Sequence, residues 1–275
     1  MGFDELAQFL ENMNNLTAAH DAYIRMRNEG STLNHIFDAN KKIVRVLFSS
    51  REYGQALTTV TRLGSSITAD EDIYNGGVMT AAKGTSLLGL GRLQEAAIAF
   101  SQAAPADFEK HADLMTPNDV AVYGGLLALA TMRRKTLHER IYLNGSFRVY
   151  LSHEPYIRKA IAHFVHCRFG ACLDLMRPYW ADYKLDVHLY PHIDRIRSMI
   201  ETKCIAGHCL AFSSVSFESL QKTFHLDRYE LVAMLEKLIQ GDGQRQPSLL
   251  PGARLDLEEG VSYIASLWIF SLILT

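Results

Sequence analysis

Residues 91–105, Gly-Arg-Leu-Gln-Glu-Ala-Ala-Ile-Ala-Phe-Ser-Gln-Ala-Ala-Pro, carry the pattern from which we infer the architecture of the N-terminal half. A turn signal at Gly91 is followed by a helical run in which Phe100 stands four positions after Ala96, and Pro105 follows the run. A small residue such as Ala96 lets the two helices of a hairpin approach closely, and the large residue one turn later fills the space beside it. The stretch therefore predicts the second helix of a helical hairpin.

The same pattern occurs twice upstream. Ala19 precedes Tyr23 after Asn14-Asn15-Leu16, and Ala56 precedes Val60 after Tyr53-Gly54, so the three alanines are spaced 37 and then 40 residues apart. This spacing is slightly looser than the ~34 residues of a tetratricopeptide repeat. Any all-helical protein contains some pairs of this kind, but three that follow a turn signal in one register favour stacked hairpins. We predict a tetratricopeptide-like α-solenoid over residues 1–115.

Residues 116–210 predict further helices. Thr116-Pro117-Asn118-Asp119 suits a helix start, and the run from Val120 to Met132 is rich in small residues, including Gly124 and Gly125. Glycine lowers helix propensity, so its presence here indicates close packing against a neighbouring helix. Helices are also expected over 154–168, 171–176 and 191–204, with a hairpin turn at Phe169-Gly170.

The pattern changes in residues 211–264, where we predict a winged helix. A short helix at 216–224, a turn at 225–227 and an amphipathic helix at 228–240 precede two strands, residues 254–258 and 261–264. The complete fold class is then mainly α: an α-solenoid followed by a winged-helix module with a small β wing.

Three segments resemble a known family. The run Asn-Asp-Val-Ala-Val-Tyr-Gly-Gly-Leu-Leu-Ala-Leu-Ala-Thr (118–131) is similar to the segment that opens the PCI domain in the subunit-one family of the COP-nine signalosome. The run Leu-Asp-Val-His-Leu-Tyr-Pro-His (185–192) resembles the same family, and Ala-Tyr-Ile-Arg-Met-Arg (22–27) resembles the helical-repeat region that this family shares with the related proteasome-lid subunit. The resemblance covers roughly residues 1 to 264.

The resemblance implies a PCI-domain scaffold, without catalysis, in the complex that removes a ubiquitin-like modifier from cullins. It also implies other PCI-domain subunits and a metalloprotease subunit as partners, an indirect connection to cullin-RING ligases, and a cytoplasmic and nuclear location. A proteasome-lid or initiation-factor PCI subunit is the close alternative. A winged-helix nucleic-acid binder and an unrecognised hydrolase are more distant ones.

Relatives in this family have further helical repeats upstream and a C-terminal helix after the wing. We therefore expect that an N-terminal part is missing here and that the gene model departs from the family at residues 265–275. The run from Ile264 to Leu274 is too short for a membrane-spanning helix, which needs about 20 apolar residues. We expect this atypical apolar tail to promote aggregation.

Composition limits the partners. The chain has 28 basic and 30 acidic residues among 275, so its overall charge favours neither nucleic acid nor an anionic membrane. Acidic residues near Met1 do not fit a secretory signal, so the four cysteines are expected to be reduced, buried and small apolar packing residues. We expect no nucleic-acid partner and no membrane partner.

No motif indicates catalysis, a metal or another cofactor. The chain contains no His-x-His zinc motif, P-loop, G-x-G-x-x-G or G-x-S-x-G. His163, His166 and Cys167 form one cluster, and His188 and His192 form another, but neither has the acidic partner that a zinc hydrolase needs. The pairs Cys167/Cys172 and Cys204/Cys209 would point about 140° apart on a helix and so away from a common metal. A catalytic nucleophile at Cys167 beside His163 or His166 would also need a third group that orients the histidine, and the sequence does not supply one.

The wing is the candidate interface. The helix 228–240 carries Arg228 and Lys237 against Glu230 and Glu236, so its charge does not favour insertion into DNA. An edge strand can instead pair with a strand of a neighbouring module. The residues that we expect at this interface are Arg254, Leu255, Leu257, Val261 and Tyr263.

Overall fold

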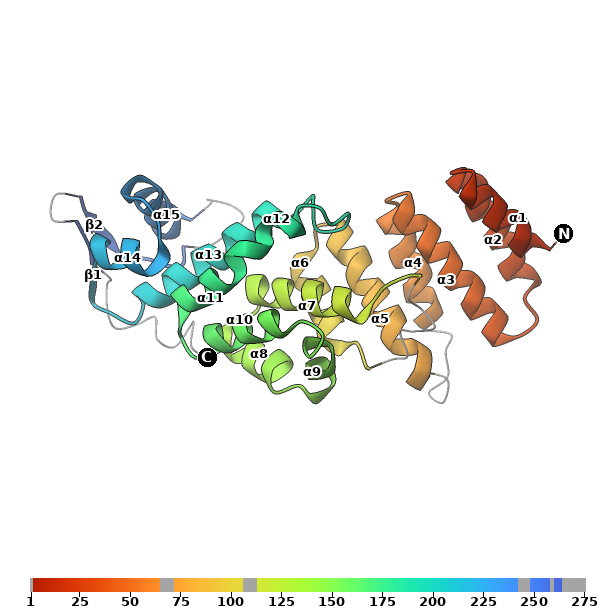
Figure 1. The fold of residues 1–275 in the computed structure, drawn as a ribbon, viewed down its shortest axis with the longest axis horizontal. Coiled ribbons are helices and arrows are strands. Elements are labelled where there is room, and N and C mark those ends of the chain that lie inside the picture. The colour runs from red at the N-terminus through yellow and green to blue at the C-terminus, as the bar shows by residue number, and fades with distance from the viewer. Residues whose placement is uncertain (1, 65–71, 106–112, 242–247, 258–259, 264–275) are drawn as a thin grey trace. The chain divides into compact units, whose positions relative to one another are not determined.

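The computed structural model describes residues 2–64, 72–105, 113–241, 248–257 and 260–263 (Figure 1). The chain forms two compact units. The first comprises Met1–Leu127 and Asn144–Glu154, and the second comprises Ala128–Leu143 and Pro155–Thr275. The sequence-based boundaries at residues 115, 210 and 264 stay predictions.

The first unit is a series of helical hairpins. Each helix from α1 to α5 packs against the next one along the chain. The helices are α1 (Phe3–Asn12), α2 (Leu16–Glu29), α3 (Leu33–Ser49), α4 (Tyr53–Gly64), α5 (Asp72–Gly89), α6 (Leu93–Gln102), the first part of α7 (Pro117–Thr131) and α9 (Gly145–Leu151).

The hairpins confirm the predicted solenoid. A residue with positive φ lies in the turn before each of α2, α4 and α6: Asn14, Arg51 and Gly91. The predicted alanine and large apolar residue of each second helix are buried, as the pairs Ala19/Tyr23, Ala56/Val60 and Ala96/Phe100 show. Tyr53 and Gly54, interpreted above as the turn, instead begin α4, because the left-handed residue is Arg51.

Helix α7 begins with a reciprocal cap. The Thr116 backbone N–H and hydroxyl both donate to Asp119 Oδ2 at 2.8 Å, and the Asp119 N–H donates to Thr116 Oγ1 at 3.2 Å. This arrangement satisfies N–H groups that the first helical turn leaves without partners. The predicted close packing at Gly124 is also present, because the Phe147 ring lies where a Cβ would project.

The helices of the second unit are short up to α13. They are the end of α7, α8 (Arg134–Leu137), the π-helix η2 (His138–Tyr142), α10 (Pro155–Val165), α11 (Phe169–Met176), the 3-10 helix η3 (Arg177–Tyr179), α12 (Trp180–Tyr183) and α13 (Ile193–Cys209). Sequence patterns missed α8, η2, α9 and α12. The predicted turn at Phe169-Gly170 is wrong, since these residues begin α11 and the chain turns at Cys167, where φ is 58°.

The winged helix completes the second unit. It contains β1 (Ser214–Ser216), α14 (Phe217–Phe224), α15 (Arg228–Gln240), β2 (Arg254–Asp256) and β3 (Val261–Tyr263). The antiparallel sheet has the order β1-β3-β2, and β1 was not predicted. Ser216 caps α14 and Asp227 caps α15, while His225 supplies the left-handed turn between them. The mainly α fold class with a small β wing is confirmed.

The apolar tail of residues 264–275 lies outside the described residues. In the part of the chain that the structure describes, no helix combines the length and apolar character needed to cross a membrane.

Candidate functional site

The predicted interface lies on β2, which forms one edge of the sheet among the described residues. Strand β2 pairs with β3 in the register Arg254 to Tyr263, Leu255 to Ser262 and Asp256 to Val261. On the other side of β3, β1 pairs Val215 with Ser262. An edge strand presents backbone donors and acceptors that another strand can satisfy.

The direction of these backbone groups follows from one hydrogen bond. The Phe217 N–H donates to the Gly260 carbonyl at 2.7 Å, which extends the β1–β3 ladder by one pair. Along a strand of an antiparallel sheet, the backbone groups of successive residues point alternately to one neighbour and to the other. The backbone groups of Ser262 therefore point toward β1, and those of Val261 and Tyr263 point toward β2. On β2 the backbone groups of Leu255 therefore point to the outer edge.

The five predicted interface residues do not share one face. Side chains alternate along a strand, so Arg254, Val261 and Tyr263 lie on the outer face of the sheet together with Asp256. Leu255 lies on the inner face opposite Ser262, which is fully buried. Leu257 follows the end of β2, and its side chain is 52% exposed.

A side chain from α15 holds the end of this edge. The Arg228 Nη2 donates to the Leu257 carbonyl at 2.7 Å across 29 residues of sequence. The bond joins the first residue of α15 to the residue that follows β2. The sequence identifies Arg228 only as a charge on this helix, because a bond from a side chain to a distant backbone carbonyl leaves no pattern in the sequence.

Helix α15 is amphipathic, as predicted, and packs against α13 and α14. On its apolar face Leu231, Leu235 and Leu238 are buried and Met234 is half-buried. On the exposed side Arg228, Glu230, Glu236 and Lys237 carry two charges of each sign, and Tyr229 is 85% exposed. This balance offers no basic surface for a phosphate backbone.

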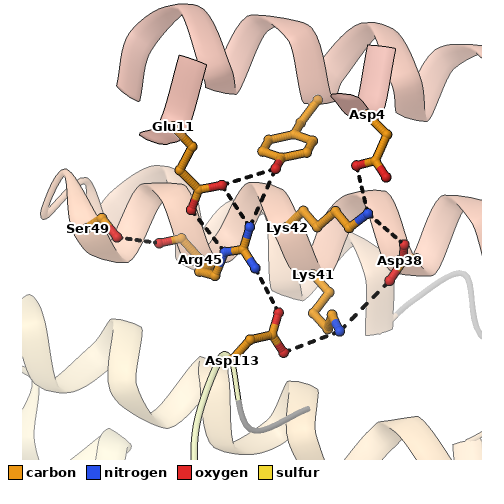
Figure 2. Close-up of polar contacts among 9 residues, drawn as sticks. Asp4, Glu11, Asp38, Lys41, Lys42, Arg45, Ser49 and Asp113 are labelled. Carbon is orange, nitrogen blue, oxygen red and sulfur yellow. Dashed lines mark hydrogen bonds and ion pairs between the residues drawn. The ribbon is translucent and has the colours of Figure 1, made fainter. Parts of the chain in front are cut away.

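A second polar cluster lies in the first unit and joins α1 to α3 (Figure 2). Arg45 forms two hydrogen bonds with the Glu11 carboxylate, from Nε at 3.1 Å and from Nη2 at 2.7 Å, and its Nη1 bonds Asp113 at 2.9 Å. The Tyr23 hydroxyl donates to Glu11 at 3.0 Å. Burial, followed by the negative charge of Glu11, raises the pKa of Tyr23.

Two lysines extend the cluster. Lys42 lies 2.7 Å from Asp4 and 3.2 Å from Asp38, and Lys41 lies 3.3 Å from Asp113. A cavity of about 470 Å³ beside it is lined by Gln8, Glu11, Asn12, Lys42 and Arg45. Each cation here already contacts a carboxylate, so the cluster fixes α1 on α3 and does not offer an anion site. The cluster was not predicted, although the spacing of Asp38, Lys42 and Arg45 along one helix face is a usable signal for it.

Comparison with known proteins adds the family. Residues 1–140 match the family model described as 26S proteasome subunit RPN7. The chain belongs to the RPN7 family. The match includes all of the helical hairpins that the sequence pattern predicted.

Three curated relatives of this RPN7-family chain are named COP9 signalosome complex subunit 1. The chain is 37% identical over 273 residues to the COP9 signalosome complex subunit 1 of Emericella nidulans, and the matched region covers 95% of this chain and 53% of the relative. It is 36% identical over 229 residues to the protein of that name in Neurospora crassa, covering 82% and 53%, and 27% identical over 263 residues to that of Arabidopsis thaliana, covering 96% and 58%. The chain spans about half the length of these relatives, and their name agrees with the resemblance stated from the sequence.

The cysteines of this RPN7-family chain occupy two environments. Cys172, Cys204 and Cys209 are buried, as predicted, whereas Cys167 is exposed and corrects the expectation that all four pack in the interior. The physical reason is that Cys167 occupies the left-handed turn after α10, and turns lie at the surface. Burial, followed by a hydrogen bond with Cys172, raises the pKa of Cys204, and burial raises that of Cys209 to about 12.

The predicted histidine clusters do not converge on a metal site. Among the described residues no group of three or more His, Cys, Asp or Glu side chains is arranged to hold a metal ion. His166 instead contacts the Tyr142 ring edge-on, with 6.0 Å between ring centroids. The backbone N–H of His188 donates to Asp186 Oδ1 at 2.8 Å, within the turn before α13. His192 stands at the N-cap position of α13.

Proposed function

We propose that this chain is a non-catalytic scaffold subunit of the COP9 signalosome. The observation that carries the proposal is the 37% identity over 95% of the chain to a protein named as subunit 1 of that complex. A scaffold acts through surfaces, and consecutive helical hairpins followed by a strand edge provide surfaces of two kinds. In this role the chain supports removal of the ubiquitin-like modifier from cullins, and so the regulation of cullin-RING ligases, in the cytoplasm and the nucleus.

The partners that we propose are other PCI-domain subunits and the metalloprotease subunit of the same complex. The wing residues Arg254, Leu255, Leu257, Val261 and Tyr263 form the proposed contact with a neighbouring winged helix. The outward backbone groups of Leu255 support this assignment, since a partner strand would satisfy them. Arg254 lies on this edge strand, and Tyr263 lies opposite it on β3, on the same outer face.

A second candidate is a subunit of the proteasome lid. The match of residues 1–140 to the family model of 26S proteasome subunit RPN7 favours it. The identities of the relatives over the whole matched chain favour the signalosome instead. Both candidates share a scaffold role.

Purification from the native organism separates the two. The tagged chain, expressed at its natural level, is recovered at low salt and the copurifying proteins are identified by mass spectrometry. We expect signalosome subunits and a cullin. Recovery of proteasome-lid subunits would replace the first candidate by the second, and neither set would overturn both.

The absence of catalysis has a separate test. The purified chain alone is incubated with a modified cullin, and release of the modifier is followed on a gel. We expect no release by the chain and complete release by the assembled complex. Release by the isolated chain that a chelator abolishes would contradict the non-catalytic assignment.

A further inference from the structure

The balanced charge of the whole chain conceals a local excess of positive charge in the second unit. Residues 133–143 and 155–168 contain seven arginine and lysine residues and one acidic residue, Glu139, whereas the whole chain has 28 basic and 30 acidic residues. The first stretch forms α8 and η2 and the second forms α10, and both α8 and η2 pack against α10 (Figure 1). The fold therefore gathers the two basic stretches in one place.

Two contacts hold α8 and η2 at the C-terminal end of α10. Arg134 Nη1 donates to the Val165 carbonyl at 3.2 Å, and the Tyr142 ring meets the His166 ring edge-on. Arg158 lies on the same face of α10 as His166, because residues four and eight positions apart share a helix face. The exposed cations on and beside these elements form what we call the basic patch: Arg133, Lys135, Arg140, Arg158, Lys159 and Arg168.

The basic patch lacks counter-charges. Elsewhere in the same unit Lys184 pairs with Asp194 at 3.0 Å and Arg197 pairs with Glu201 at 2.7 Å. Among the described residues, by contrast, no carboxylate forms an ion pair with any of the six cations of the basic patch, although Glu139 is exposed among them. Like charges gathered in this way repel one another and weaken the compact state, so the stability of the fold does not explain them.

We propose that the basic patch is a docking surface for an acidic segment, rich in aspartate and glutamate, of another protein. Charge complementarity favours this partner, because four of the six cations are arginines, which bind carboxylates through two parallel hydrogen bonds. Arg140 lies on the π-helix η2, and π-helices are rare elements that occur frequently at functional sites. The inference depends neither on the proposed contact at the wing nor on the identity of the complex.

The aromatic rings beside the basic patch favour a protein partner over nucleic acid. Proteins that bind single-stranded nucleic acid combine cations for the phosphates with aromatic side chains on which the bases stack. Here His138 stacks on Tyr142, with 5.6 Å between ring centroids and 22° between ring planes, and Tyr142 in turn contacts His166. These rings pack against one another and hold η2 on α10, so the basic patch presents charge without an aromatic platform for bases.

The test measures binding of the full chain to a fluorescent poly-glutamate peptide by anisotropy. We expect binding at low salt that weakens as the salt concentration rises to about 0.15 M, because exposed charges are then screened. Arg158→Glu combined with Lys159→Glu should weaken binding about tenfold, because repulsion replaces attraction at both positions. The matched control is Arg195→Glu combined with Lys222→Glu, which makes the same change of charge at exposed positions of α13 and α14 and should leave the affinity unchanged.

A milder pair of substitutions separates binding from folding. Arg158→Gln combined with Lys159→Gln removes both positive charges and introduces no negative ones. This variant should bind the peptide several-fold more weakly, while its denaturant midpoint stays the same or rises, because the two cations have no carboxylate partner to lose. A lower midpoint would show that these cations stabilise the fold, and would overturn the proposal that they serve a partner.

The probe for nucleic acid is an oligouridine of the same charge as the peptide. If it binds more tightly than the peptide and loses affinity in the Arg158→Glu and Lys159→Glu variant, the partner is a nucleic acid and the proposed acidic segment is wrong. Equal losses in the control variant, or no binding of the peptide at low salt, would overturn the basic patch as a docking surface. None of these outcomes bears on the scaffold role, which copurification tests separately.

Discussion

Gly124 of α7 lies directly against Phe147 of α9: a Cβ at Gly124 would be 2.7 Å from Phe147 Cζ and 3.0 Å from Phe100 Cβ. The Phe147 ring and the Phe100 Cβ occupy the space that any larger residue would need, so the glycine allows α7 to approach both neighbours. Here close packing outweighs the cost of glycine in a helix, which is about 1 kcal/mol.

We expect Gly124→Ala to lower the free energy of unfolding by about 1–3 kcal/mol, because the added methyl group displaces the Phe147 ring. Gly145→Ala is the control, since no atom lies within 4 Å of its added Cβ and alanine favours a helix start over glycine. Denaturant titration followed by circular dichroism measures both. Equal stability of the two variants would contradict the packing argument.

Lys203 of α13 caps the C-terminal end of α7. Its Nζ donates to the carbonyl of Met132 at 2.6 Å and to that of Leu129, and it lies 5.1 Å from the centroid of the Phe164 ring. Burial lowers the pKa of Lys203 to about 8, and the neighbouring thiols of Cys204 and Cys172 offset this only in part. The folded chain therefore releases a proton that the unfolded chain keeps between pH 8 and about 10.5.

Stability relative to Lys203→Met should consequently rise with pH in that window. The unfolded state binds more protons there, so deprotonation favours the folded state, by at most about 3 kcal/mol over the whole range. Urea titrations of both proteins at about pH 7.5, about pH 9 and about pH 10.5 measure the difference in stability. These pH values run from below the pKa of Lys203 in the folded chain to its pKa in the unfolded chain. A difference that is constant across these pH values would show that the pKa of Lys203 is not lowered by folding.

The Arg45–Glu11 pair should stabilise the packing of α1 on α3. Its side chains are 26% and 21% exposed and share two hydrogen bonds, so a double-mutant cycle with Glu11→Gln and Arg45→Met should give a coupling of about 1 kcal/mol. The Arg92–Glu95 pair is the control. It has a similar geometry on an exposed helix surface, with exposures of 48% and 53%, and should show a smaller coupling that salt removes.

Cys167 should be the fast-reacting thiol of the folded chain. It is exposed, whereas the other three cysteines are buried, and burial keeps Cys204 and Cys209 protonated. An aromatic disulfide reagent should titrate one thiol rapidly in the native chain and four in denaturant. Cys167→Ser should remove the rapid phase, and a rapid phase that persists in this variant would contradict the burial of the others.

The sequence by itself determined the elements whose signals are local. Alanine and a large apolar residue one turn apart identified α2, α4 and α6, because those side chains meet on one helix face whatever the rest of the chain does. The turn at 225–227 and the apolar period of the helix after it likewise predicted the helix-turn-helix. Ser216 and Asp227 cap its two helices, and a cap also acts within three residues of the backbone that it satisfies.

Only the tertiary structure decided the features that join distant residues. The strand β1, with three residues, carries no period long enough to recognise, and it exists because β3 pairs with it. The Arg228–Leu257 bond and the contacts of Arg45 with Glu11 and Asp113 cross 29, 34 and 68 residues of sequence. Such contacts depend on where packing places each element, and therefore the direction of the wing edge and its partner surface follow from the fold and not from the local pattern.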